Sequence, residues 1–360
     1  MTIQVNCGGV LIGGGAPIPI QSMTNTYTED INATIAQINE LAESGCDIVR
    51  CAVPTTEAAT ALAAICKTSP IPVVADIHFD YKLALLAIES GVDKIRINPG
   101  NIGSIDRVRA VVESAKDRGI PIRIGVNSGS LEKDLLEKFG GATAEALAES
   151  ALRNIEILDN LNFSDVVVSI KSSDVLTNTK AHMILSQKTD KPLHIGITEA
   201  GIGEKAIVKS SVGIGALLAH GIGDTLRVSL TGNPVQEIVA AKDILRSVDK
   251  LNGAINLISC PTCGRCKTEL AKVATEVSEA IAPIEKQRIE AAKKSKNLLK
   301  TITVAVMGCA VNGPGEASHA DLGVACGDGR AVYFENGEKK DTIPVEVILK
   351  TITTGIEKLI

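Results

Sequence analysis

The most constraining feature of the sequence is a regular alternation of short β-branched runs with longer amphipathic segments. Runs of strand character lie at residues 18–23, 48–53, 73–77, 94–98, 121–126, 166–170, 193–198 and 225–230. Segments of helical character follow them at residues 32–44, 57–68, 81–90, 105–118, 143–160, 174–188, 205–220 and 235–248. Alternation of this kind predicts parallel strands joined by crossover helices. Eight such units over about 230 residues fit a closed (β/α)8 TIM barrel better than an open doubly wound sheet.

Local signals support this α/β class. In the first helical segment Ile35, Ile38 and Leu41 recur at helical spacing. Glycines such as Gly45 and Gly91 stand between a helical segment and the next strand, where a left-handed cap ends a helix. The glycine-rich N-terminus lacks the strand and helix that flank a dinucleotide-binding loop. We expect it to form a hairpin that plugs the bottom of the barrel.

The C-terminal ends of barrel strands carry the chemistry in this fold. These positions hold Arg50, Asp76, His78, Arg96, Asn98, Arg123, Asn127, Lys171, Thr198, Glu199, Arg227 and Ser229. Arginine offers a rigid donor fork that matches phosphate oxygens, and lysine adds a point charge. Any one of the five cations, taken alone, is as consistent with a surface ion pair as with a binding site. Five of them in a chain of net charge −5 predict a polyanionic small-molecule ligand, most simply a diphosphate.

The alternation ends near residue 250, and a smaller domain follows. Residues 254–259 and 301–307 have strand character and lead to Cys260 and Cys309. Residues 268–281 read as a helix that stops near Pro283, residues 286–300 as a charged helix or linker, and residues 345–360 as a closing helix. Asn336-Gly337 between two short runs is a strong hairpin signal. We predict a barrel domain at residues 1–249 and an α+β domain at residues 250–360.

Four cysteines of the second domain have metal-ligand spacing. Cys260, Cys263 and Cys266 lie within seven residues, and Cys309 follows in a Gly/Pro-rich loop. Thiolates select zinc, copper(I) or iron–sulfur clusters. A zinc ribbon has two cysteine knuckles or a cysteine–histidine mixture, and the second half here offers one cysteine, so iron–sulfur is favoured over zinc. A site of all four cysteines remains open for zinc or for an electron-transfer cluster.

Composition excludes several classes of function. With 2% aromatic residues, no Trp and a negative net charge, the chain is not expected to bind nucleic acid. It has no run of about 18 apolar residues that would span a membrane, and its first residues do not resemble a signal peptide. The other cysteines, among them Cys7, Cys46 and Cys51, are expected as reduced core residues. We therefore expect a soluble cytoplasmic protein.

Several longer motifs carry a resemblance to a known family. They lie at residues 21–24, 75–79, 94–101, 123–127, 198–201, 223–229, 259–263 and 312–316. Because these motifs have the family's residues and follow one another in the same order, the chain resembles the 4-hydroxy-3-methylbut-2-enyl diphosphate synthase family from about residue 2 to its C-terminus. The resemblance implies a step of the non-mevalonate isoprenoid pathway: two-electron reductive ring opening and dehydroxylation of 2-C-methyl-D-erythritol 2,4-cyclodiphosphate to (E)-4-hydroxy-3-methylbut-2-enyl diphosphate.

The resemblance also implies a cofactor, partners and residue roles. A [4Fe–4S] cluster would be held by Cys260, Cys263, Cys309 and Glu316, and reduced flavodoxin or ferredoxin would supply electrons to a homodimer. Arg50, Arg96, Arg123, Asn127, Lys171, Thr198, Arg227 and Ser229 would bind substrate. Glu199 would donate a proton to the departing hydroxyl, and Asp76 and His78 would orient or support the site.

One position departs from the family pattern, and one other reading stays open. Cys266 occupies a position that is often not cysteine in the family, and we interpret it as a thiol near the cluster without a ligand role. The competing hypothesis is a dihydropteroate-synthase-like barrel that binds a phosphorylated substrate and carries a structural zinc domain.

Overall fold

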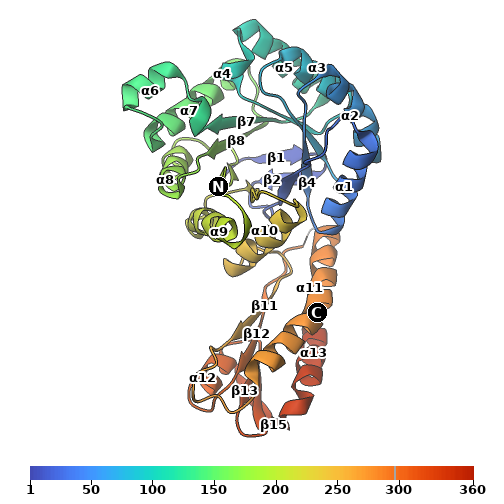
Figure 1. Cartoon of the computed structure of the whole chain (residues 1–360), viewed down its shortest axis with the longest axis vertical. Helices are drawn as coiled ribbons and strands as arrows, with labels where there is room; N and C mark the ends of the chain where they lie inside the picture. The colour runs from blue at the N-terminus through green and yellow to red at the C-terminus, as the bar shows by residue number, and fades with distance from the viewer. Residues whose placement is uncertain (296) are drawn as a thin grey trace. The chain divides into compact units, whose positions relative to one another are not determined.

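The computed structural model describes residues 1–295 and 297–360, which form two compact units, Met1–Val248 and Asp249–Ile360 (Figure 1). Each unit has its own sheet and its own hydrophobic core. No described helix combines the length and apolar character needed to cross a membrane.

The first unit is a ring of parallel strands. Six of them pair in chain order, β3 (Gln21–Met23), β4 (Ile48–Ala52), β5 (Val73–Asp76), β6 (Lys94–Ile97), β7 (Ile122–Asn127) and β8 (Val166–Lys171). Two short strands, β9 (His194–Ile195) and β10 (Thr225–Leu226), pair with each other. Single parallel bridges, Val168–Leu193 and Ile20–Leu226, join this pair to β8 and to the residue before β3. The ring is therefore closed, and the predicted (β/α)8 barrel is confirmed.

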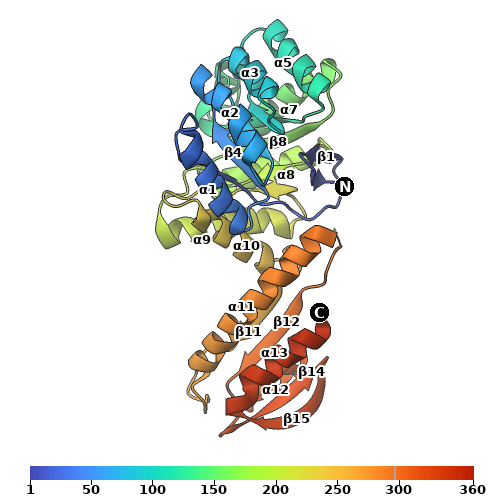
Figure 2. The ribbon, with the colours of Figure 1, turned by 90° about the vertical axis from the view of Figure 1, so that its right-hand side faces the viewer.

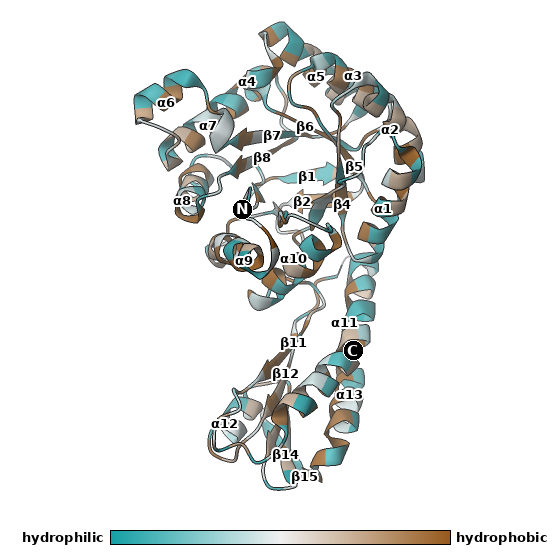
Figure 3. Cartoon of the chain, viewed as in Figure 1, coloured by the Kyte–Doolittle hydropathy of each residue, from teal (hydrophilic) through white to brown (hydrophobic). Residues whose placement is uncertain are grey.

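Helices cover the outside of the ring, one after each strand. They are α1 (Ile31–Glu43), α2 (Thr56–Thr68), α3 (Tyr81–Glu89), α5 (Ile105–Arg118), α7 (Ala144–Asn160), α8 (Val175–Ser186), α9 (Gly203–Ala219) and α10 (Val235–Ser247). Side chains such as Asp30, Thr55 and Thr143 cap helix N-termini by accepting backbone N–H bonds. Three short elements, α4 (Pro99–Ile102), the 3-10 turn Ser128–Ser130 and α6 (Lys133–Phe139), lie in the loops near β6 and β7. In Figure 3 the barrel strands are hydrophobic, whereas the helices carry hydrophilic residues.

Two strands are shorter than the sequence predicts. Runs 193–198 and 225–230 have strand character, but only His194–Ile195 and Thr225–Leu226 form β9 and β10. The Arg227 N–H still bonds to the Ile195 carbonyl at 3.0 Å, and beyond it the backbones approach closely. A Cβ at Gly196 would collide with the carbonyl oxygen of Arg227. The remaining residues of both runs therefore leave the sheet and form loops at the barrel mouth.

An N-terminal hairpin closes the other end of the barrel. Strands β1 (Gln4–Cys7) and β2 (Val10–Gly13) pair antiparallel. Their inward side chains form one core cluster with barrel residues: Val5, Cys7 and Ile12 with Ile48, Val74 and Val167. The predicted plug is therefore present.

The strand register arranges the inward side chains in layers. Followed once around the ring, the register returns to β3 eight residues lower, which is the shear of a (β/α)8 barrel, with four side chains per layer from alternate strands. From the plug upward the first three layers are Pro19, Pro72, Pro121, Pro192; then Ile48, Lys94, Val167, Thr225; then Gln21, Val74, Arg123, His194. Continuing the alternation upward, past the ends of β6, β9 and β10, gives Arg50, Arg96, Ser169, Arg227; then Met23, Asp76, Gly125, Gly196; then Ala52, Asn98, Lys171, Ser229. The upper half of the interior is therefore polar, where such barrels are usually apolar.

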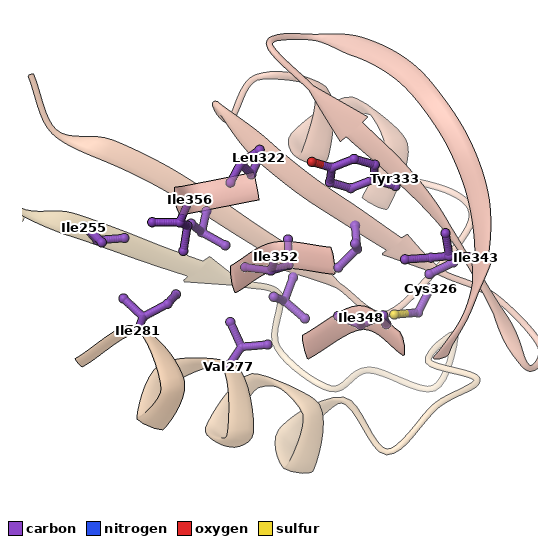
Figure 4. Packing of buried hydrophobic residues seen from close by; sticks show 14 of the residues in the cluster. Ile255, Val277, Ile281, Leu322, Cys326, Tyr333, Ile343, Ile348, Ile352 and Ile356 are labelled. Carbon is purple, nitrogen blue, oxygen red and sulfur yellow. The ribbon is translucent and has the colours of Figure 1, made fainter. Parts of the chain in front are cut away.

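The second unit is a five-stranded sheet in the order β11 (Ile255–Ser259), β12 (Ile302–Met307), β13 (Leu322–Cys326), β14 (Arg330–Glu335) and β15 (Glu338–Pro344). The first three strands are parallel, and β14 and β15 form the predicted hairpin, whose turn residues Asn336 and Gly337 both have positive φ. Helices α11 (Leu270–Ser295) and α13 (Ile348–Leu359) pack on one face, where Val277, Ile281 and Ile352 join the core (Figures 2 and 4). Helix α12 (Gly313–Ser318) lies on the other face.

One sequence prediction for this unit is wrong, and two of its elements were not predicted. Helix α11 does not stop at Pro283 but continues through it to Ser295. A proline inside a helix costs about 3 kcal/mol, and here Ile289 and Ala292 beyond it are buried, which offsets that cost. The charged segment 286–300 is therefore helical as far as residue 295, and its position 296 lies outside the described residues. Strand β13 was not predicted, and the Gly/Pro-rich loop after Cys309 contains the short helix α12.

Candidate functional site

Most of the strand-end residues singled out in the sequence lie at the C-terminal mouth of the barrel, but Arg123 does not: it is the second residue of β7 and its side chain belongs to a deeper layer. Asp76 forms the centre of one ion-pair group and is 4% exposed. Its Oδ1 lies 3.0 Å from Nη1 of Arg96, and its Oδ2 lies 3.6 Å from Nε of Arg50 and 3.6 Å from Nε2 of the exposed His78. Burial alone raises the pKa of the Asp76 carboxyl, but Arg50, His78 and Arg96 reverse this and hold the pKa well below its usual range. Asp76 is thus an ionised group that orients cations.

Arg227 belongs to a second ion pair, which the sequence reading missed. Its Nε and Nη2 lie 3.0 and 2.9 Å from the two carboxylate oxygens of Glu237, in the first turn of α10. Glu237 is 2% exposed and also accepts hydrogen bonds from Ser22 and from the backbone of Leu230. Arg227 is therefore not a free cation. In the sequence, this pair is indicated only by an acidic residue in the first turn of the helix that follows a strand-end arginine. That pattern is too common to predict an ion pair.

Arg123 and Lys171 have no such partner in the part of the chain that the structure describes. Both are buried, and among the described residues neither lies within 4 Å of a carboxylate. The Nε and Nη1 atoms of Arg123 are buried and make no hydrogen bond to the described residues. Burial, with Arg50 nearby, lowers the pKa of both side chains, that of Lys171 well below its ordinary value. An anion bound at the mouth would supply the missing acceptors and counter-charge.

A cavity of about 250 Å³ opens at this end of the barrel. Six of the predicted strand-end residues line it: His78, Arg96, Asn98, Asn127, Thr198 and Glu199. With its amide oriented to satisfy both partners, Asn127 accepts from Nη2 of Arg96 at 3.1 Å. Glu199 is exposed and has a φ of 51°, a left-handed conformation that is strained for glutamate. Arg50, Arg123, Lys171, Arg227 and Ser229 are not part of this lining.

Other interior residues were missed by the sequence reading because they sit in the middle or at the start of strands. Lys94, Gln21 and His194 are fully buried in the two layers below Arg50, Arg96 and Arg227, and each has a side-chain polar atom that makes no hydrogen bond to the described residues. Burial lowers the pKa of His194 well below its usual range, so the ring is neutral. The sulfur of Met23 lies 2.9 Å from Nη2 of Arg50.

The thiols of the second unit lie at one end of its sheet. Cys260 directly follows β11 and Cys309 lies two residues after β12, and these parallel strands are neighbours. The Gly308 N–H donates to Sγ of Cys260 at 3.3 Å. Backbone N–H groups of Asn312, Val311 and Gly313 lower the pKa of the Cys309 thiol, and the Arg265 N–H lowers that of Cys263. Donors that stabilise thiolates suit a soft metal or an iron–sulfur cluster, so these cysteines fit such a group.

The remaining candidates of this unit differ in their surroundings. Glu316 is exposed, in helix α12. Cys266 is half-buried; its Sγ donates to the Thr268 carbonyl at 3.1 Å and lies 2.6 Å from the place that a Cβ on Gly308 would take. Across residues 1–295 and 297–360, no three His, Cys, Asp or Glu side chains are brought into positions that could hold a metal ion. The predicted ligand set is thus in one region of the sheet without being drawn together.

A closed (β/α)8 barrel with a cationic mouth, followed in the same chain by an α+β domain with thiols at one end of its sheet, defines a two-domain barrel enzyme for an anionic substrate. The chain belongs to the GcpE family: residues 2–242 match its TIM-barrel domain and residues 256–358 its C-terminal domain. The resemblance seen in the sequence is confirmed.

Similar proteins span the same length. The chain is 51% identical over 358 residues to a protein of Ruminiclostridium cellulolyticum, covering 99% of this chain and 98% of that protein. It is 52% identical over 357 residues to one of Clostridium perfringens, covering 98% of each. Both are named 4-hydroxy-3-methylbut-2-en-1-yl diphosphate synthase (flavodoxin). A solved dihydropteroate synthase of Yersinia pestis is similar with a TM-score of 0.49 and 11% identity, covering 69% of this chain and 98% of that one, a likeness that lends no weight to the competing hypothesis.

Proposed function

We propose that this chain is a 4-hydroxy-3-methylbut-2-enyl diphosphate synthase: it reduces 2-C-methyl-D-erythritol 2,4-cyclodiphosphate by two electrons, opening the ring and removing a hydroxyl. The observation that carries the proposal is the identity of about half of all residues, across both domains, with relatives of that name. The test is anaerobic turnover of the cyclodiphosphate by the full chain with reduced flavodoxin. Absence of product under conditions where a relative is active would refute it.

In the barrel, Arg123 and Lys171 are the buried cations that gain most from a bound diphosphate, because neither has a carboxylate partner among the described residues. Arg50 and Arg96, which share Asp76, and Arg227 are the other cations that bind the diphosphate. Ser229, Asn127 and Thr198 add neutral hydrogen-bonding groups. Glu199, exposed on the cavity wall, is the proton donor to the departing hydroxyl. Asp76 is unsuited to that role because its low pKa keeps it ionised at neutral pH. His78 supports the Asp76 carboxylate.

In the second domain, Cys260, Cys263, Cys309 and Glu316 would hold a [4Fe–4S] cluster. When bound, the cluster supplies the electrons and a Lewis-acidic iron. A carboxylate ligand binds iron less durably than thiolate, so Glu316 would leave one coordination position exchangeable. Anaerobically purified chain is expected to be brown, with about four iron and four sulfide per chain. Colourless protein with stoichiometric zinc would refute this assignment.

A pair of variants separates the ligand roles of Glu316 and Cys266. Glu316→Ala is expected to weaken the cluster, read as lost iron and an altered visible spectrum, while the barrel stays folded. Cys266→Ser is expected to keep its iron content, because the thiol already donates to Thr268 and is not needed as a ligand. Loss of iron from Cys266→Ser with full iron in Glu316→Ala would reverse the assignment.

We also propose flavodoxin as the electron donor and a homodimer as the working form, in the cytoplasm. The donor follows from the relatives' names. Turnover that depends on reduced flavodoxin, and a mass by light scattering of twice the 37.6 kDa of one chain, are the expected results. A monomer with full activity would exclude the dimer.

A further inference from the structure

Glu237 is the most heavily hydrogen-bonded carboxylate of the barrel mouth, and the proposed function assigns it no role. Four donors reach its two oxygens: Nε of Arg227 at 3.0 Å and Oγ of Ser22 at 2.8 Å on Oε2, and Nη2 of Arg227 at 2.9 Å and the Leu230 N–H at 3.1 Å on Oε1. With 2% exposure and four donors, the carboxylate has a single orientation.

This pairing decides which edge of Arg227 remains available. The fork formed by Nε and Nη2 is occupied by Glu237, so Nη1 is the group left over. Nη1 points to the sulfur of Met23 at 3.7 Å. The same sulfur lies 3.2 and 2.9 Å from Nε and Nη2 of Arg50. A thioether is a weak acceptor, so a phosphate oxygen exchanges for it readily.

The charges around the mouth show that Glu237 does not serve affinity. Arg50, Arg96, Arg123, Lys171 and Arg227 are the five cations, and a carboxylate beside one of them lowers the attraction for a diphosphate. Removing Glu237 would make the mouth more positive and free the Arg227 fork for bidentate phosphate contact. A residue that reduces affinity while fixing an orientation acts on how the substrate is held.

We propose that Glu237 is a positioning residue. By occupying Nε and Nη2 of Arg227, it leaves Nη1, beside the Met23 sulfur that Arg50 also contacts, as the group that binds the diphosphate, so that the diphosphate is held in one orientation. This inference rests on the proposed function. Through Ser22 and Leu230, Glu237 also ties Arg227 to β3 and to the loop after β10, on either side of the Ile20–Leu226 bridge, one of the two single bridges that close the ring.

The test compares Glu237→Gln and Glu237→Asp with the wild-type chain. Glu237→Gln keeps the volume and removes the charge. Glu237→Asp keeps the buried charge, but its side chain is one methylene shorter, so its carboxylate is drawn back from Arg227. Each is measured for kcat, KM, calorimetric binding of inorganic pyrophosphate, and the pose of pyrophosphate in a crystal. Lys191→Gln is the matched control, because it breaks a barrel ion pair, with Asp159 at 3.2 Å, at the end opposite the mouth.

We expect kcat to fall about tenfold or more in both variants. Glu237→Gln should bind pyrophosphate at least as tightly as the wild type does, and in its crystal structure Arg227 should be turned toward the pyrophosphate. Lys191→Gln keeps wild-type kcat and KM. The inference is overturned if both Glu237 variants keep kcat within twofold, or if Glu237→Gln binds pyrophosphate more weakly. Failure of the wild-type chain to turn over substrate would refute the proposed function alone, because pyrophosphate binding and pose still report on Glu237.

Discussion

Replacing Asp76 by Asn removes one buried negative charge and leaves the shape of the side chain unchanged. Asp76 is 4% exposed and lies 3.0 Å from Nη1 of Arg96 and 3.6 Å from Nε of Arg50. At an effective dielectric constant of about 20, each pair is attracted by about 5 kcal/mol before the cost of burying the charges. Removing one partner of a buried pair typically costs about 3–5 kcal/mol. His78 is 56% exposed, and its contribution is screened by solvent.

We expect Asp76→Asn to lower the free energy of unfolding of the barrel by about 3 kcal/mol. Urea unfolding followed by far-ultraviolet circular dichroism is the suitable assay, because the chain contains no Trp. Since the carboxylate offsets the charge of two guanidinium groups, inorganic pyrophosphate should restore part of the loss. Pyrophosphate should therefore stabilise the variant more than the wild-type chain.

The matched control is Asp159→Asn, which breaks an ion pair with Lys191 whose carboxylate is 51% exposed. Its effect is expected to stay within about 1 kcal/mol. A change of less than about 1 kcal/mol for Asp76→Asn, or equal stabilisation of variant and wild type by pyrophosphate, would refute the ion-pair reasoning.

Three further outcomes follow from the structure. Gly125→Ala places a Cβ against Nε of Arg96 and should lower kcat/KM by about 100-fold. Gly215→Ala is the control: it has open space around its Cβ and should keep the wild-type kcat/KM, and steady-state kinetics of both variants measure the difference. Lys94→Met should raise the free energy of unfolding by about 1–3 kcal/mol at neutral pH, since the ammonium is fully buried and makes no hydrogen bond to the described residues. Burial, with the charges of Arg123 and Arg50, lowers the folded-state pKa of Lys94 against the opposing effect of Cys7. The unfolded chain therefore binds more protons between the two pKa values, and wild-type stability rises as pH approaches the unfolded pKa. The variant's advantage in urea titrations should shrink as pH approaches 10.5, and a constant advantage would contradict this. Pro283→Ala should stabilise α11 by about 1–3 kcal/mol, read as a higher melting temperature, and a lower one would contradict the reasoning.

The sequence was sufficient for the barrel because its pattern is local. Periodicity within a helix such as Ile31–Glu43, and the glycine after it, act over a few residues and predict each element separately. The count of eight units favours a closed barrel over an open sheet, and the two single bridges of the structure close it. The prediction was wrong where packing outweighs local preference: Pro283 stays in a helix because residues on both sides of it are buried.

The site was predictable in its residue types and less so in its pairings. Arg50, Arg96 and Asp76 were expected at the mouth because strand ends converge there. That Glu237 takes the Arg227 fork, and that Asp76 serves two arginines, depends on side-chain directions that the spacing of residues does not specify. Lys94 and His194 were missed because a barrel interior is expected to be apolar.

Strand β15 has a consequence for how copies of this chain associate. It is the last strand of its sheet, and it begins with Glu338, Lys339, Lys340 and Asp341, all exposed, and ends at Pro344. Four charges in a row and a terminal proline oppose the addition of a strand from another molecule. We therefore expect copies of the chain to remain soluble at high concentration without forming sheet-to-sheet fibres along this edge, and any stable assembly to use side-chain surfaces instead of shared backbone hydrogen bonds at β15.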